Sequence, residues 1–409
     1  MNVLISNIVG ANCVTCADHF AQATSLLHRL MFWGWMQPRT ETHGAVKSDA
    51  PDRDPPPAIE PQASSETNPP ASPRNVRSRP RVLQAPIDRN ARIGAAPEAG
   101  GAAAAPLEKT GMLKEAQFLT ASYTGHAGTC VYKLYVPGAY CGRPLPLIVM
   151  LHGCTQSASD FAAGTGMNEL GEAHACFVAY PAQPESANGS KCWNWFSPSH
   201  QQRGCGEPSL IAGITTQIMR DFAIDRRRVY VAGLSAGGAA AVVLGATYPD
   251  IFAAIGVQSG LACGAARDVS SAFAAMRHGR AEVSNGSPLL PSNSTHIPTI
   301  VFHGGKDMTV HPRNGDQVIE QSRSRSNADG RIATRRGRIA GGHSYTQTSY
   351  LDAKGDALHE MWAVHEAGHA WSGGSPAGSY TDPHGPNASR EMLRFFLAHP
   401  QPAAAVPGS

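Results

Sequence analysis

The sequence predicts an α/β fold in which a mostly parallel central sheet is flanked by helices, with a disordered N-terminal extension. From about residue 112 onward, short apolar runs typical of strands alternate with helical stretches, which is the pattern of a sheet covered on both faces. Residues 233–238, Gly-Leu-Ser-Ala-Gly-Gly, connect one such run to a helical run through a sharp turn. The 409 residues, of which 42% are hydrophobic, are enough for a sizeable core.

The expected elements follow the apolar pattern along the chain. The expected strands are Cys130–Val136, Leu147–Leu151, Cys176–Tyr180, Val229–Ala232, Phe252–Val257, Thr299–Phe302 and Met361–His365. The expected helices are about Phe161–Ala173, Pro208–Phe222, Ala236–Thr247, Asp316–Ser322 and Ser389–Leu397. Residues 183–206 are rich in Ser, Asn, Trp and Gly, and we expect them to form a long loop over the functional edge of the sheet, since long loops in compact domains are usually functional.

Residues 1–110 are predicted to be a largely disordered extension, followed by one folded domain over 111–400 and a disordered tail over 401–409. Eleven of the fifty residues from 51 to 100 are proline, and such a segment buries too little apolar surface to offset its ordering entropy. The stretch Leu26–Met36 is apolar and aromatic. It is interpreted either as a tail or satellite helix without further role, or as a short hydrophobic anchor.

Charge, hydropathy and cysteine content exclude several classes of protein. A net charge of +3 and a pI near 8.4 are too mild to indicate nucleic-acid binding. No apolar run reaches the roughly 18 residues of a membrane span. The N-terminus lacks the basic region and the uninterrupted apolar stretch of a secretory signal, which favours a cytoplasmic location over secretion. Nine cysteines leave at least one unpaired within the chain, and the sequence alone assigns no disulfide pairs.

Ser235 is the candidate nucleophile. It is the serine of a Gly-x-Ser-x-Gly turn that follows the apolar run Arg228–Ala232 and precedes the run Ala239–Tyr248. Strand, turn and helix in this order form a nucleophile elbow, in which glycines let the helix pack against the strand while the serine hydroxyl stands exposed. The alternative is a glycine-rich turn that happens to contain a serine.

A serine nucleophile needs a base, and the base needs an acid that orients it. Asp307 follows the expected strand Thr299–Phe302 and is the candidate acid, with a turn aspartate capping a helix as the alternative. His369 follows the last expected strand and is the candidate base. Because the chain has 17 histidines, this assignment depends on position rather than on residue type.

The oxyanion hole needs two backbone N–H groups aimed at the developing negative charge. One is expected from Ala236, directly after the serine. The other is expected from Cys154, in the loop His152–Gln156 that leaves an expected strand. The Cys154 side chain is expected to take no part in the chemistry.

One motif points to a different chemistry. Residues 365–369, His-Glu-Ala-Gly-His, match the H-E-x-x-H signature of zinc peptidases. That motif needs a helix so that both histidines face one metal, whereas the flanks here predict a strand before it and a loop after it. We therefore expect no zinc at these residues, and the serine mechanism requires no metal or organic cofactor.

Taken in order, these motifs resemble the catalytic domain of polyhydroxybutyrate depolymerases and related feruloyl and acetylxylan esterases. The matching segments are 152–156, Cys-Trp-Asn-Trp-Phe at 192–196, 203–208, 233–238, 303–310, 368–374 and 378–383. The resemblance covers about residues 115–398. It implies an α/β-hydrolase fold and hydrolysis of carboxylic esters, with Ser235, Asp307 and His369 as the catalytic triad.

The resemblance implies a polyester or small ester as substrate, foremost poly(3-hydroxybutyrate) or its oligomers. Trp193, Trp195 and Trp371 are the candidate substrate-binding residues, with core packing under the loop as the alternative for Trp193 and Trp195. The N-terminal segment could contact a storage-granule surface. The competing hypotheses are a feruloyl or acetylxylan esterase and a non-catalytic granule-surface binding protein.

Overall fold

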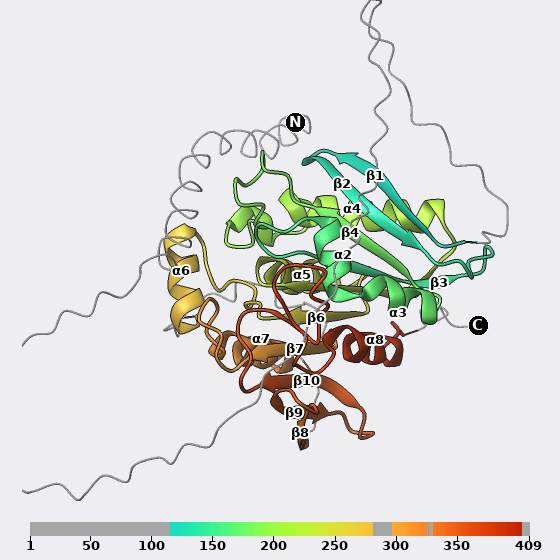
Figure 1. Ribbon diagram of the computed structural model, residues 1–409. Helices are drawn as coiled ribbons and strands as arrows, with labels where there is room; N and C mark the ends of the chain where they lie inside the picture. Colours follow the sequence, from blue (N-terminus) through green and yellow to red (C-terminus); the bar gives the residue numbers. More distant parts are fainter. Residues whose placement is uncertain (1–114, 281–296, 325, 327–329, 403–409) are drawn as a thin grey trace, which may run out of the picture. The chain divides into compact units, whose positions relative to one another are not determined.

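The computed structural model describes residues 115–280 and 297–402, apart from 325 and 327–329. The expected N-terminal extension with its anchor at 26–36, and most of the expected tail at 401–409, lie outside the described residues. In the described part the chain forms a ten-stranded sheet in the order β1-β2-β4-β3-β5-β6-β7-β10-β9-β8 (Figure 1). Its strands are β1 (Gln117–Gly125), β2 (Gly128–Val136), β3 (Leu145–Leu151), β4 (Phe177–Ala182), β5 (Ile224–Leu234), β6 (Ala254–Gln258), β7 (Thr299–Gly304), β8 (Ile332–Arg338), β9 (Ser344–Leu351) and β10 (Ala357–Val364). A second, two-stranded sheet pairs β11 (Trp371–Ser372) with β12 (Thr381–Asp382).

The centre of the large sheet is parallel and its two edges are antiparallel. Strands β4, β3, β5, β6, β7 and β10 run parallel to their neighbours. The β1–β2 hairpin continues the sheet at one edge and the β9–β8 hairpin at the other, both antiparallel. The carboxyl ends of the parallel strands therefore meet at one edge of the sheet, where ligands bind in open α/β folds. The predicted fold class is confirmed.

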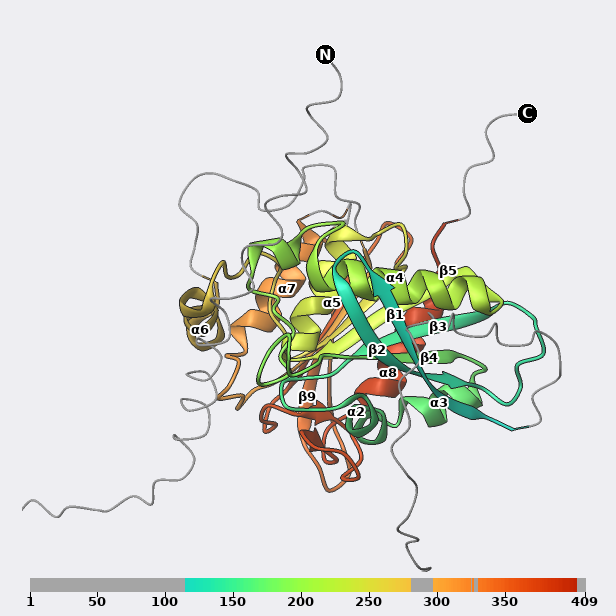
Figure 2. The same cartoon turned by 90° about the horizontal axis from the view of Figure 1, so that it is seen from above.

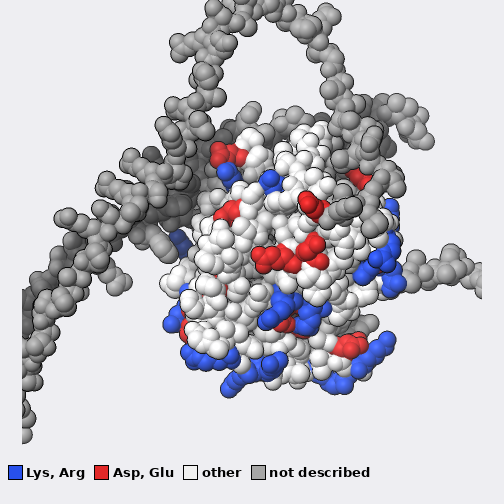
Figure 3. Space-filling view, turned by 45° about the vertical axis from the view of Figure 1, so that its right-hand side comes forward, with Lys and Arg blue, Asp and Glu red and all other residues white. Residues whose placement is uncertain are grey.

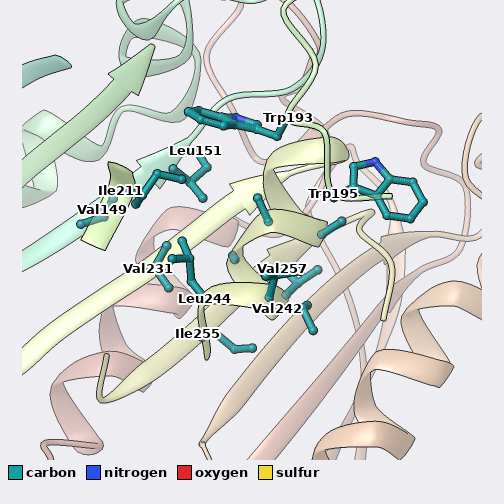
Figure 4. Packing of buried hydrophobic residues seen from close by; sticks show 14 of the residues in the cluster. Val149, Leu151, Trp193, Trp195, Ile211, Val231, Val242, Leu244, Ile255 and Val257 are labelled. Atoms are coloured by element: carbon teal, nitrogen blue, oxygen red, sulfur yellow. The ribbon is translucent and has the colours of Figure 1, made fainter. Parts of the chain in front are cut away.

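Helices cover both faces of the sheet, as Figure 2 shows. Those on one face are α4 (Gly206–Asp221), α5 (Ala236–Thr247), α6 (Val269–His278) and α7 (Arg313–Arg323); those on the other are α2 (Ala158–Thr165), α3 (Met167–Ala173) and α8 (Ala388–Ala398). The side chains of strand β3 alternate between the helix layers on the two faces of the sheet. Its residues 147, 149 and 151 pack with the first set of helices, while 148 and 150 pack with the second. Figure 4 shows Val149 and Leu151 in the first of these clusters. All five side chains are fully buried, as expected of a parallel strand covered on both faces.

The structure differs from the predicted elements in several places. The strands β1, β8 and β9 and the helix α6 were not expected from the sequence. The expected helix over Phe161–Ala173 is two helices, because Gly166 between them adopts φ 61°, in the left-handed region that ends a helix. The strands that the sequence did not predict lie at the edges of the sheet, where half-exposed side chains weaken the pattern of apolar residues.

No helix within the described ranges is both long enough and apolar enough to cross a membrane. On the face shown in Figure 3, acidic and basic side chains lie beside one another rather than in a field of a single sign.

Candidate active site

Ser235 sits on a strained turn between β5 and α5. Its backbone adopts φ 57° and ψ −117°, and its N–H donates to the carbonyl of Gln258 at 2.9 Å. The flanking glycines are required by close approach. A Cβ atom at Gly233 would lie 2.3 Å from the backbone of Gly237, and one at Gly237 would lie 2.1 Å from the carbonyl oxygen of Leu151. The predicted strand–turn–helix junction is therefore present, with the serine at its apex.

The loops that carry Asp307 and His369 are held together by their backbones. The N–H of Gly305 donates to Val364, at the end of β10, and the N–H of Lys306 donates to Ala367. A Cβ atom at Gly304 would lie 2.3 Å from the carbonyl oxygen of Gly368, so this approach also depends on glycine. The result is a direct contact, 2.7 Å long, between His369 Nδ1 and Asp307 Oδ2.

The Asp307 carboxylate is buried and fully engaged. Its Oδ1 accepts from the backbone N–H groups of Thr309 and Val310, and its Oδ2 accepts from His369 Nδ1–H. Burial opposes ionisation of this carboxyl, but interactions with His303 and His369 outweigh burial and hold its pKa below the usual range. Asp307 therefore stays charged, and its bond to Nδ1–H leaves Nε2 of His369 as the nitrogen that can accept a proton.

The loop after β3 presents the Cys154 N–H from a rigid frame. The Gly153 N–H donates to Gln156 Oε1 at 2.9 Å. Buried His152 accepts from the Gln183 N–H at Nε2 and contacts the Gly153 carbonyl through Nδ1, which fixes the neutral tautomer; desolvation lowers its pKa. Within the described residues no acceptor is assigned to the Cys154 N–H, and the Ala236 N–H is the first of α5 and lacks a helical partner.

A disulfide bond joins this loop to the tryptophan-rich loop. It links Cys154 to Cys192 across 38 residues of sequence. The sequence left the pairing open, because cysteine spacing does not define connectivity. The bond places residues 192–196 directly beside the candidate oxyanion donor.

A buried carboxylate, which the sequence analysis did not single out, supports the same loop. Glu207, in the first turn of α4, accepts hydrogen bonds from Gln183 and from both the backbone and side-chain nitrogens of Asn194. His200 Nδ1 lies 3.2 Å from Glu207 Oε2. Glu207 falls in the 203–208 segment quoted for the family resemblance, and that was the only signal of its importance.

Ser235 and His369 open onto one pocket of about 570 Å³, together with both candidate oxyanion residues. The wall is largely aliphatic and aromatic; its apolar members include Trp195, Phe196, Leu261, Phe273, Met276 and Val310. Part of this wall is α6, which the sequence did not predict. An apolar pocket with a few polar groups at one end is the usual form of a small-molecule site.

Of the three candidate substrate-binding tryptophans, Trp195 lines the pocket. Trp193 and Trp371 are each 1% exposed and are not among the described residues that form its wall. The indole N–H of Trp193 donates to the His152 carbonyl, and that of Trp371 to Ser389 Oγ. Figure 4 shows Trp193 above the core residues around Leu151. Both side chains are buried and hydrogen-bonded at their indole nitrogens.

The H-E-x-x-H residues do not converge. His365 contacts Thr346 Oγ1 through Nε2, Glu366 accepts from Ser344, and His369 faces Asp307. The segment follows the end of β10 as a turn and a bend, not a helix. The geometry of a zinc-peptidase motif is therefore missing from these five residues.

Comparison with known proteins places the chain among esterases. The family model described as "Esterase PHB depolymerase" matches residues 130–344. Poly(3-hydroxyalkanoate) depolymerase C of Paucimonas lemoignei is 37% identical over 43% of this chain and 44% of its own length. A probable acetylxylan esterase A of Neosartorya fischeri is 30% identical over 48% and 55% of the two chains, and feruloyl esterase B of Neurospora crassa is 30% identical over 53% and 76%.

The chain spans about half the length of the first two of these relatives. Among solved structures, an acetyl xylan esterase from Aspergillus awamori matches 69% of this chain and 98% of its own with a TM-score of 0.51 at 21% identity. At that identity the likeness supports the fold alone, and it agrees with the α/β-hydrolase architecture expected from the sequence.

Proposed function

The chain belongs to the esterase PHB depolymerase family, and from this premise we propose that it is a serine carboxylesterase that hydrolyses poly(3-hydroxyalkanoate) polymer or its oligomers. One observation carries the proposal. Ser235 and His369 open onto the same pocket, and His369 is held by the buried Asp307 at 2.7 Å.

The proposed reaction passes through an acyl-enzyme. Ser235 Oγ attacks the ester carbonyl carbon while His369 Nε2 accepts the hydroxyl proton. Asp307 stabilises the imidazolium, and the N–H groups of Cys154 and Ala236 meet the tetrahedral oxyanion. Collapse of this intermediate breaks the ester C–O bond, and His369 returns the proton to the leaving alcohol oxygen. Water then attacks the acyl-enzyme with the same histidine as base, which releases the acid and restores Ser235.

The pocket wall favours an aliphatic acyl group. Trp195, Phe196, Phe273 and Met276 offer an apolar surface that an aliphatic group can cover, and burying a sugar hydroxyl against these side chains would cost its hydration. The second candidate function is an esterase that acts on plant polysaccharide, and it is supported by the relatives named as acetylxylan and feruloyl esterases.

A single cation among the described wall residues suggests how oligomers are held. Arg277, near the end of α6, lines the pocket and forms no ion pair with a described carboxylate. A short hydroxyalkanoate oligomer ends in a free carboxylate, which a guanidinium binds with paired hydrogen bonds. We expect Arg277→Ala to raise KM for oligomers while leaving kcat and the rate on their methyl esters unchanged. An equal effect on acids and methyl esters would exclude this contact.

The function is tested by measuring 3-hydroxybutyrate release from amorphous polymer and from oligomers, beside acetyl- and feruloyl-sugar esters. Wild type should release the hydroxy acid and Ser235→Ala should not. Ser270→Ala, at an exposed serine of α6, is the matched control and should keep full activity. Turnover of the sugar esters alone would replace the proposed substrate class. Granule binding without any Ser235-dependent hydrolysis would leave only a binding role.

The proposed granule contact concerns residues 26–36, which lie outside the described residues. Deleting residues 1–40 should reduce co-sedimentation with storage granules without lowering turnover of soluble oligomers. Unchanged co-sedimentation would remove the anchor from the proposal.

A further inference from the structure

Two histidines and an aspartate that do not line the pocket converge with one another. His343 precedes β9, Asp382 ends β12, and His384 follows two residues later. One ligand atom from each lies within 4.8 Å of the other two. His343 Nε2 is 2.8 Å from Asp382 Oδ2, and His384 Nδ1 is 3.4 Å from Asp382 Oδ1.

We propose that His343, Asp382 and His384 form a binding site for a first-row divalent cation, with zinc as the best fit. Two imidazoles and one carboxylate are a donor set that suits zinc and its neighbours, whereas calcium and magnesium prefer oxygen alone. Two ligand atoms that each lie about 2.0–2.1 Å from a zinc ion are roughly 3.4 Å apart at a tetrahedral angle. The separations of 2.8 Å from His343 Nε2 to Asp382 Oδ2 and 3.4 Å from His384 Nδ1 to Asp382 Oδ1 are near this value. All three ligand atoms lie within 4.8 Å of one another, so rotation of these side chains would bring them onto one ion.

A further carboxylate is placed to orient one ligand. His343 Nδ1 lies 4.0 Å from Glu366 Oε2, on the opposite side of the ring from Asp382. A histidine that binds a metal through one nitrogen usually donates its other N–H to a carboxylate, which fixes the ring and its tautomer. Glu366 is itself held by the N–H and hydroxyl of Ser344.

The site is open to an ion from solvent. The His384 side chain is 63% exposed, while His343 and Asp382 are 21% and 14% exposed. Hydrogen bonding between His343 and Asp382 accounts for that pair without an ion. The backbone N–H of His384 donates to Asp382 Oδ1, and this turn places the exposed His384 ring beside the same carboxylate, where it can serve as a further ligand.

Such an ion would cross-link the two chain segments that flank the segment carrying His369. The N–H of His365 donates to the Ser344 carbonyl, next to His343, and the N–H of Gly373 donates to the Asp382 carbonyl. A metal between His343 and Asp382 would join the two backbones that flank residues 365–373. It would stabilise this segment without contacting the pocket, so the proposal is independent of the substrate.

The test is metal binding by the full chain without a histidine tag. Cobalt(II), whose visible spectrum reports nitrogen and oxygen ligation, and zinc by calorimetry are the probes. We expect one bound ion, and at least about tenfold weaker binding in His384→Ala and Asp382→Asn, because even outer ligand partners contribute tenfold or more. His174→Ala, an exposed histidine of α3's C-terminal end, should bind as wild type does.

Thermal unfolding gives the second readout. Zinc should raise the Tm of wild type and His174→Ala, and not that of His384→Ala, since a ligand bound only by the folded state stabilises it. His384 is exposed, so its removal leaves the fold intact. Absence of binding by wild type, or equal binding by wild type and both site variants, would overturn the proposal.

Discussion

The Cys154–Cys192 disulfide offers a stability change that can be calculated from the structure. The perturbation is the double substitution Cys154→Ala and Cys192→Ala. In the chain-entropy description, cross-linking a loop of 38 residues stabilises the folded state by about 4 kcal/mol, because the unfolded chain loses that loop's freedom. At about 2 °C per kcal/mol for a domain of this size, the Tm should fall by about 8 °C.

The same variant should also lose activity, because the bond fixes the loop that presents the Cys154 N–H. Loss of one oxyanion donor lowers kcat by about 10²–10³-fold, which sets the upper limit for a loosened loop. The assays are thermal and urea unfolding, both followed by fluorescence, and kcat on a soluble ester. Cys205→Ala, at a cysteine without a disulfide, is the control and should change neither quantity by more than a small amount.

Two results would refute this reasoning. An unchanged unfolding midpoint in the double variant would mean that the loop is held by its hydrogen bonds alone. A destabilised variant with full kcat would mean that the disulfide does not position the donor.

Further predictions concern the frame of the site. Asp307→Asn should lower kcat by about 10⁴-fold, because the amide favours the wrong imidazole tautomer. The pKa of Asp307 is held below its usual range, so the ionised carboxylate stabilises the fold at pH values above that range, and this stabilisation is lost as the pH falls. Between about pH 7 and about pH 3, the urea midpoint of Asp307→Asn should therefore fall less than that of wild type. Glu207→Gln should destabilise the protein by at least about 2 kcal/mol in urea unfolding, because an amide nitrogen would face the donors of Asn194. Gly304→Ala should abolish activity or folding, whereas Gly368→Ala, whose Cβ would meet nothing within 4 Å, should be tolerated; equal behaviour of the two in an activity and solubility assay would contradict the predicted contact.

The parallel core and the order of the site residues were accessible from the sequence. Strands buried on both faces appear as continuous apolar runs, so β3, β6 and β7 were found within two residues of their ends, whereas β5 begins five residues before the expected run. The elbow at Ser235 was found because its glycines are a steric requirement of the turn. Asp307 and His369 followed from their positions after strands.

The edges of the sheet were not accessible in the same way. All but one residue of β8 are exposed, and β9 is mostly half-buried, so neither has an apolar run. Helix α6 is rich in serine and alanine and has few buried residues. The Cys154–Cys192 pairing and the carboxylate cluster at Glu207 depend on contacts between distant segments, which a local pattern does not encode.

Among the described strands β8 lies at one edge of the large sheet, and this has a consequence for how copies of the protein meet one another. An exposed edge strand offers unpaired backbone groups to any neighbouring chain, which is a route to aggregation. Here the edge carries exposed Arg335, Arg336 and Arg338, so a second copy pairing along β8 would bring guanidinium groups of like charge together. Repulsion between these arginines therefore opposes pairing of a second copy along β8. Because salt screens this repulsion, self-association should become easier as the ionic strength rises.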